Sequence, residues 1–338
     1  MLKSAIKYIN WRIQTVRKRV LVLRVFLAIR VQRFIVLWVL LELNFLAFIS
    51  ILSKSTTFKT SNKTLNYFLI QAVGRGIILI VIFMFLMRVS YVMLRLLYFL
   101  ALLIKLGGVP FHSWYLRLIQ KLSWEIIWVL SIWQKFIPLL IMCKPRFNLL
   151  LLTGALRVRL SRISRISQKN VKKILGLSSI FSLGWVLVSF DLNKFVWVQF
   201  ILGYGASLLV LLSGFILSNH GVSQDFNKLA NTSNLLIFFL GFLIISGIPP
   251  FIGFFLKIII IFNLIESRIG VRLLFLIFSL LLIFVYLNII FLLFTFVVKK
   301  FSFSRLINQR SHFFLDLLVL NLGLRALFLI NFCNLLRK

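Results

Sequence analysis

The chain consists of long apolar runs separated by short polar or basic stretches. A membrane-spanning helix needs about 20 mostly apolar residues, and runs of roughly that length recur from residue 34 onward. Strands of a membrane barrel would alternate polar and apolar residues, and these runs do not. The pattern therefore predicts about ten helical spans. The predicted spans are residues 34–53, 65–87, 91–107, 124–143, 147–160, 174–190, 195–218, 235–265, 272–298 and 313–335.

Two of these spans are interrupted by glycine and proline. Residues 91–107 end at a Gly-Gly-Val-Pro sequence and lead into an amphipathic segment over residues 110–121. Residues 235–265 are too long for one span and contain Gly-Ile-Pro-Pro at 247–250. Proline removes a backbone donor and clashes with the preceding turn, and a broken span is tolerated only inside protein or beside water. Interrupted spans in both halves are typical of inverted-repeat transporters, so we predict an all-α polytopic membrane protein with two broken helices.

Composition excludes a soluble domain and narrows the possible partners. The 338 residues are 61% hydrophobic, and the mean hydropathy is +1.05. A net charge of +34, from 40 basic and 6 acidic residues, usually indicates nucleic-acid binding. Here much of the charge flanks or interrupts apolar segments, so we predict no nucleic-acid partner. Basic loops instead set orientation and contact anionic lipid such as cardiolipin.

The N-terminal segment differs from the rest of the chain. Residues 1–33 hold nine basic residues and no acidic one, spread around a helical wheel rather than along one stripe. We interpret residues 1–33 as a basic arm with a poorly defined first helix, and residues 34–338 as the transmembrane domain. An arginine-rich targeting segment is the alternative interpretation.

Four charged residues are candidates for intramembrane chemistry: Glu42, Lys105, Lys135 and Lys257. An ionisable group at mid-depth costs about 2.5–3.5 kcal/mol on insertion scales, and Lys135 lies near the middle of its span. Lys105 precedes the first break and Lys257 follows the second. A buried lysine changes charge state when a carboxylate approaches or leaves, and Glu42 is the conspicuous intramembrane carboxylate. These residues predict a proton relay in which water bridges the gaps.

Simpler interpretations stay open for individual residues. Arginines 75, 88 and 95 also lie in or near spans, so charge within a span is not unusual in this chain. Lys105 is near a helix end and can snorkel, and Glu42 can pair with a neighbouring arginine.

Five motifs in order carry a family resemblance over roughly residues 35–260. They are Leu41-Glu42-Leu43-Asn44, Lys105-Leu106-Gly107 with Pro110-Phe111-His112, Trp133-Gln134-Lys135 with Pro138, Ser178-Ser179-Ile180 with Gly184-Trp185, and Gly247-Ile248-Pro249-Pro250 with Lys257. At these residues the chain resembles the antiporter-like subunit 2 family of mitochondrial NADH:ubiquinone oxidoreductase, respiratory complex I.

The resemblance implies an antiporter-like bundle that translocates protons in the membrane arm of the complex. Its relay residues map onto Glu42, Lys105, Lys135 and Lys257. It implies no cofactor in this chain, with FMN, iron–sulfur clusters and ubiquinone in partner subunits, so the chain is a non-redox subunit of the enzyme. The implied location is the mitochondrial inner membrane, as a multi-pass protein beside other membrane-arm subunits.

The chain departs from the family pattern in its charge. Its basic content is higher, and Arg75 stands on a helix that is normally small and apolar at that point. We interpret the extra basic residues as an adaptation to acidic partners or lipids. Two rival functions remain: a stand-alone cation/proton antiporter subunit, and a structural scaffold that binds lipid through its basic loops.

Overall fold

The part of the chain that the structure describes, a computed structural model, is helical and contains no strand. It comprises residues 27–28, 34–53, 58–87, 91–143, 170–190, 196–217, 240–249, 251–263 and short helical pieces between 276 and 288. The chain divides into two compact units, Met1–Lys121 with Val129–Phe147, and Leu122–Trp128 with Asn148–Lys338.

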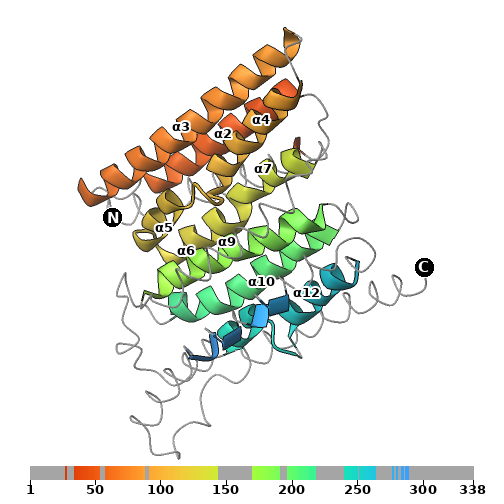
Figure 1. Cartoon of the computed structure of the whole chain (residues 1–338). Coiled ribbons are helices and arrows are strands. Elements are labelled where there is room, and N and C mark those ends of the chain that lie inside the picture. Colours follow the sequence, from red (N-terminus) through yellow and green to blue (C-terminus); the bar gives the residue numbers. More distant parts are fainter. Residues whose placement is uncertain are drawn as a thin grey trace, which may run out of the picture. The chain divides into compact units, whose positions relative to one another are not determined.

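The first unit is made of helices that pack side by side. Helix α3 lies against both α2 and α4, and α7 also packs on α2 and α4, as the warm-coloured ribbons show (Figure 1). The elements are α2 (Phe34–Leu52), α3 (Phe58–Leu86), α4 (Tyr91–Leu106), α5 (Ser113–Gln120), the π-helical turn η1 (Val129–Trp133) and α7 (Gln134–Cys143).

Helix α2 illustrates why these segments are helical and where their faces lie. Leu37, Leu41 and Phe48 recur at helical spacing and are buried, whereas Val39 and Leu46 on other faces are 41% and 51% exposed. A helix that is apolar all round, with one stripe packed on its neighbours, is suited to lipid on its remaining faces. The free faces of α2 therefore need no further protein cover.

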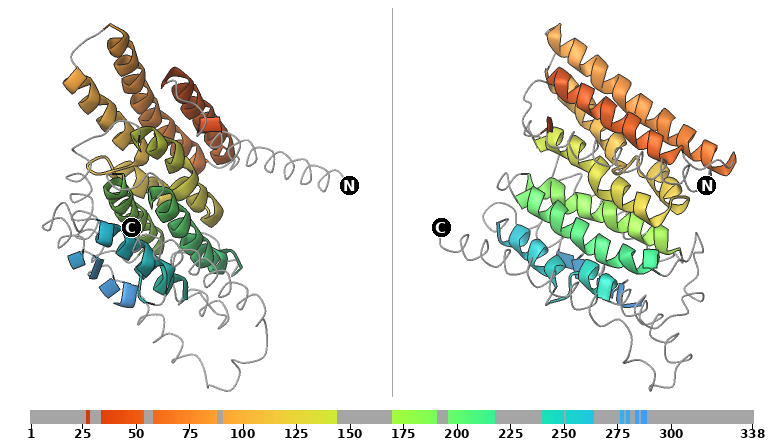
Figure 2. Two further views of the ribbon diagram at one scale, coloured as in Figure 1. Left: turned by 90° about the vertical axis from the view of Figure 1, so that its right-hand side faces the viewer. Right: turned by 180° about the vertical axis from the view of Figure 1, so that it is seen from behind.

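The second unit contains α6 (Trp124–Trp128), α9 (Val171–Ser189), α10 (Val196–Leu217) and α12 (Ile252–Asn263). Residues 240–246 are also helical. Helix α10 packs on α6, α9 and α12, and the green and teal ribbons of α9, α10 and α12 follow one another (Figure 2).

Side chains fix the contacts of α10. The ring of Trp124 stacks on Phe215 with centroids 3.9 Å apart, and the indole N–H of Trp128 donates to the Gly205 carbonyl at 3.1 Å. Gly203 lets α12 approach, since a Cβ there would lie 2.5 Å from the Leu256 Cδ1 atom.

The all-helical prediction is confirmed for the described residues. Five of their helices are long and apolar enough to cross a membrane, by length and composition: Ile35–Leu52, Thr64–Leu86, Trp124–Cys143, Val171–Ser189 and Val196–Phe215. Both predicted breaks are present. The predicted spans 147–160 and 313–335 lie outside the described residues, as do most of 272–298 and all of the basic arm except residues 27–28.

Two boundaries differ from the prediction. Helix α3 begins at Phe58 rather than at residue 65, because an apolar window does not detect helical turns that continue into polar sequence. Helix α9 begins at Val171 rather than at residue 174, so Lys172 and Lys173 lie in its first turn.

Candidate functional site

The first break lies at the end of α4 and places Lys105 in the last helical turn. Gly107 has a φ of 63°, the left-handed conformation that glycine adopts without steric cost. The Gly108 N–H then reaches back to the Leu103 carbonyl at 2.9 Å, which is the hydrogen bond of a Schellman cap. A Cβ at Gly107 would lie 2.8 Å from the Tyr115 Cβ, so glycine also permits α5 to approach. The chain turns away within two residues of Lys105.

Lys135 lies in the first turn of α7 and is 4% exposed. Its Nζ lies 4.5 Å from the centroid of the Tyr115 ring, where the π-face partly offsets the loss of water. The backbone around it is irregular on both sides. The π-helical turn Val129–Trp133 precedes it, and Pro138 removes the amide that would reach the Gln134 carbonyl. Such irregular backbone is frequent at functional sites within helices.

Lys105 and Lys135 line one cavity inside the first unit, together with the amides of Asn44, Gln71 and Gln134. The cavity offers about 20 Å³ to the centre of a water molecule. A site needs about 10–15 Å³ by this measure, and two to four polar partners, to hold one water. Both requirements are met, so the two lysines face a space that can hydrate them.

Amide groups tie the walls of this cavity together. The Asn44 Nδ2 of α2 donates to the Gln134 Oε1 of α7 at 2.9 Å, and the Gln71 Nε2 of α3 donates to the Lys105 carbonyl at 3.3 Å. The Asn44 Oδ1 and Gln134 Nε2 atoms are buried without a hydrogen-bond partner among the described residues. They are one acceptor and one donor suited to a bridging water.

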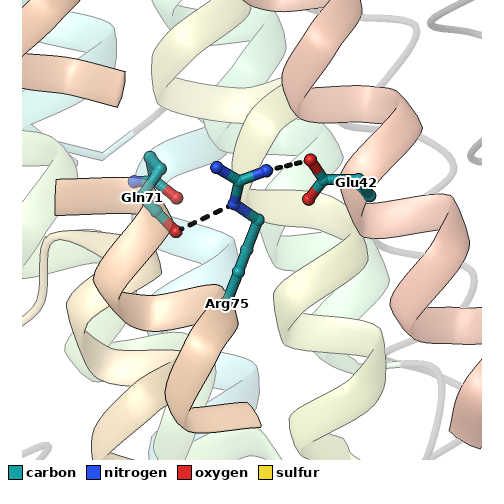
Figure 3. Close-up of polar contacts among 3 residues, drawn as sticks. All are labelled: Glu42, Gln71 and Arg75. Atoms are coloured by element: carbon teal, nitrogen blue, oxygen red, sulfur yellow. Dashed lines mark hydrogen bonds and ion pairs between the residues drawn. The ribbon is translucent and has the colours of Figure 1, made fainter. Parts of the chain in front are cut away.

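Glu42 of α2 is not among the residues that line this cavity, and it pairs with Arg75 of α3 (Figure 3). The Arg75 Nη1 donates to the Glu42 Oε1, and its Nε donates to the Gln71 backbone carbonyl at 3.3 Å. No ion pair joins Glu42 to Lys105 among the described residues. The alternative left open by the sequence, pairing with a neighbouring arginine, is the arrangement that the structure contains.

Lys257 lies at the second break, within the second unit. Helical residues 240–246 end at Gly247, whose φ is 75°, and α12 starts after the Pro249 turn. The Lys257 Nζ reaches back from α12 and donates to the Ser246 carbonyl at 2.7 Å. The break removes the backbone amide that would donate to the Ser246 carbonyl in a continuous helix, and the Lys257 ammonium donates to it instead. The sequence predicted that Lys257 lies at a break, and the structure identifies the Ser246 carbonyl as its hydrogen-bond acceptor.

Lys172 is a buried cation that the sequence analysis missed. It is 1% exposed, its Nζ donates to the Leu122 carbonyl at 2.6 Å, and it lies 4.7 Å from the centroid of the Trp124 ring. Lys172 stands before the predicted span 174–190, and nothing in the local sequence indicated that it is buried. The available clue was its place directly before the apolar run of α9.

Replacing Lys172 by Met should destabilise the protein without changing its chemistry. Methionine keeps the long stem but leaves the buried Leu122 carbonyl unsatisfied, which costs about 1–3 kcal/mol. We expect a lower thermal midpoint for the assembled protein, with activity per assembled protein unchanged. Lys173→Met, one residue along and only half-buried, is the matched control. Equal midpoints for the two variants would show that the Lys172 contacts carry no net stabilisation.

Within the described residues, no group of three or more His, Cys, Asp or Glu side chains is gathered that could hold a metal ion. The candidate chemistry of the site therefore rests on lysine, carboxylate, amide and tyrosine side chains around a cavity with room for water.

Comparison with known proteins places this arrangement in a family. The sequence profile of a transmembrane family described as NADH:quinone oxidoreductase/Mrp antiporter matches residues 32–284. Because this is well over half of the chain, the protein belongs to that family.

Named relatives agree with the motif resemblance. NADH-ubiquinone oxidoreductase chain 2 of Anopheles gambiae is 32% identical over 240 residues, which cover 67% of this chain and 70% of that protein. The protein of the same name from Lumbricus terrestris is 28% identical over 270 residues, covering 77% of this chain and 81% of its own length. The predicted membership of the antiporter-like subunit 2 group is confirmed.

Solved structures support the fold. A chain of respiratory complex I from Thermus thermophilus with bound Aureothin matches with a TM-score of 0.71 and 19% identity, over 92% of this chain and 76% of that one. A chain of an archaeal membrane-bound sulfane sulfur reductase gives 0.73 and 17%, over 88% and 69%. A chain of the Mrp complex from Dietzia sp. gives 0.63 and 17%, over 75% and 55%. At these identities the likeness shows an antiporter-like fold.

Proposed function

We propose that this chain is a proton-translocating subunit in the membrane arm of respiratory complex I. It couples electron transfer from NADH to ubiquinone to proton movement through intramembrane charged residues. The observation that carries the proposal is the cavity shared by Lys105 and Lys135, two buried lysines that line one space with room for water beside a helix break.

Lys135 is the central proton carrier in this proposal. An ammonium buried at 4% exposure keeps its proton only while its surroundings compensate the charge. The neighbouring Lys105 ammonium opposes that charge, so protonation of one lysine weakens protonation of the other. A proton that arrives at Lys105 therefore favours release from Lys135, and water in the cavity is the route between them.

Glu42 and Lys257 have separate roles. Glu42 responds to the neighbouring subunit, and its charge sets the state of Lys105. Lys257 controls exchange with the far side of the membrane. Its hydrogen bond to the Ser246 carbonyl, at a helix break, supports this role because such a bond forms with the ammonium and weakens on deprotonation.

Family membership supports the remaining parts of the proposal. The chain is a non-redox subunit that works only within the complex, and FMN, iron–sulfur clusters and ubiquinone are held by partner subunits. Its partners are other membrane-arm subunits of the mitochondrial inner membrane. The net charge of +34 favours contacts with anionic lipid such as cardiolipin.

Native electrophoresis of gently solubilised membranes tests this function. We expect the chain, identified by mass spectrometry, in the band that stains for NADH dehydrogenase activity. Recovery only in a smaller complex without flavin and iron–sulfur subunits would contradict the proposal. A second measurement, proton uptake by vesicles containing the active band, should show pumping driven by NADH oxidation.

A stand-alone cation/proton antiporter subunit is the second candidate, favoured by the likeness of the fold to a chain of the Mrp complex. That function predicts exchange of cations for protons in vesicles without NADH. Cation flux that depends on the chain but not on NADH would favour this candidate over the pump.

A further inference from the structure

Arg75 lies between α2 and α3, where several groups hold its side chain in place. Its guanidinium donates to the Glu42 carboxylate and to the Gln71 carbonyl, and its carbon Cζ lies 4.0 Å from the centroid of the Phe45 ring. A second ring, that of Phe68, has its centroid 5.7 Å away. The side chain is 14% exposed, so the cation is held on three sides rather than extended into solvent.

The chemistry of arginine makes this a fixed charge. The guanidinium stays protonated in proteins, so Arg75 cannot carry a proton through the cycle. The Glu42 carboxylate, by contrast, can gain or lose a proton. Its Oε1 atom accepts the hydrogen bond from Arg75, and its Oε2 atom is buried without a hydrogen-bond partner among the described residues. With Glu42 ionised the pair is neutral, and with Glu42 protonated or withdrawn it carries one positive charge.

This charge lies on a helix that packs directly against the helix of Lys105. Gly74, the residue before Arg75, lets α4 approach α3, since a Cβ there would lie 3.1 Å from the Lys105 Cγ. Gln71 joins the two sites directly, because its backbone carbonyl accepts from Arg75 and its side-chain amide donates to the Lys105 carbonyl. Two cations on helices that pack against each other repel in a medium of low dielectric constant.

We propose that Arg75 is a positioning residue that converts the state of Glu42 into proton release from Lys105. While Glu42 is ionised and paired, its negative charge offsets the repulsion between the guanidinium and the Lys105 ammonium. When Glu42 takes up a proton or leaves, the unmatched guanidinium repels that ammonium and its proton passes to water in the cavity. This inference rests on the proposed pump function and adds a residue to it.

Other groups around Lys105 do not supply the same signal. The titratable side chains that share its cavity are Tyr67 of α3, Tyr115 of α5 and Lys135 of α7. The tyrosines are neutral as phenols, and Lys135 changes charge itself during transfer. Arg75 therefore supplies a constant positive charge, and the protonation state of Glu42 decides whether that charge is neutralised.

The test is the pH dependence of proton pumping by the assembled complex. Arg75→Gln removes the repulsion and leaves the Glu42 charge unmatched, so Lys105 keeps its proton to higher pH. We expect the acid limb of the pumping profile to move to higher pH by about 0.5–1 unit. Glu42→Gln leaves the guanidinium unmatched, and the same limb should move to lower pH. The double variant should lie near the wild type.

Opposite shifts separate charge coupling from a structural role, because loss of a structural contact would change both single variants in the same way. Arg75→Lys keeps the charge and should restore most of the wild-type profile. Arg95→Gln, an exposed arginine on α4, is the matched control and should leave the profile unchanged. If Arg75→Gln does not assemble, Glu42→Gln decides alone, because a shift to higher pH in that variant overturns the proposal.

Failure of this inference can be told apart from failure of the pump function. Shifts in one direction, or none, together with impaired pumping in Lys135→Met would overturn the role of Arg75 and leave the function standing. Normal pumping in Lys135→Met would count against the relay itself.

Discussion

Replacing Lys135 by Met should abolish most proton pumping while leaving the complex assembled. Methionine has a similar length and fits an apolar wall, so the helix α7 keeps its packing, but the group that carries the proton is gone. We expect coupled turnover to fall by at least about tenfold, equivalent to about 1.4 kcal/mol of lost transition-state stabilisation. The measurement is NADH:ubiquinone turnover and proton uptake in vesicles, normalised to the assembled complex on a native gel.

Two further variants sharpen this result. Lys135→Arg preserves the positive charge and the contact with the Tyr115 ring but cannot release a proton, so it should block pumping as well. Lys121→Met removes an exposed lysine at the end of α5 and should behave like the wild type. Unchanged pumping in an assembled Lys135→Met complex would remove Lys135 from the relay.

The helices and their breaks were predictable because lipid constrains the backbone so strongly. A span without internal hydrogen bonds cannot remain in hydrocarbon, so long apolar runs become helices. Gly107 and Gly247 marked the breaks because glycine takes the left-handed conformation at low cost, and both have positive φ in the structure. The amphipathic segment 110–121 likewise became α5, which buries Trp114 and Leu118.

The pairing of charges was not predictable in the same way. Arg75 and Glu42 are 33 residues apart, and no local rule distinguishes this partner from the other basic residues near the spans. The π-helical turn before Lys135 has no sequence signature of its own. Burial of Lys172 depends on a carbonyl 50 residues away. In each case the deciding contact is tertiary, whereas the apolar pattern records only exposure to lipid.

The two breaks show how sequence and geometry complement each other. In both, a helix ends at a left-handed glycine. The sequence predicted the two breaks, with Lys105 before the first and Lys257 after the second. The surroundings of the lysines differ: Lys105 lines a cavity with room for water, and Lys257 donates to a backbone carbonyl. The sequence located both charges, and only the structure shows that one lines a cavity while the other donates to the carbonyl at a helix end.

Gly247→Ala should damage the second break by two routes. The φ of 75° costs a non-glycine residue about 1–2 kcal/mol. The new Cβ would also lie 2.5 Å from the Lys257 Nζ, so the ammonium must leave the Ser246 carbonyl. We expect a lower thermal midpoint and a fall in proton pumping of about tenfold or more, because a small displacement of a reacting group has a large effect on rate.

Gly76→Ala is the matched control, since a Cβ at that position of α3 meets no heavy atom within 4 Å. Alanine is favoured over glycine inside a helix by about 0.5–1 kcal/mol, so this variant should be as stable as the wild type or more so, with normal pumping. Combining Gly247→Ala with Lys257→Met separates the two routes. If the loss of pumping acts through Lys257, the double variant pumps no worse than Lys257→Met alone, whereas an additive loss would show that the strained backbone acts independently of the lysine.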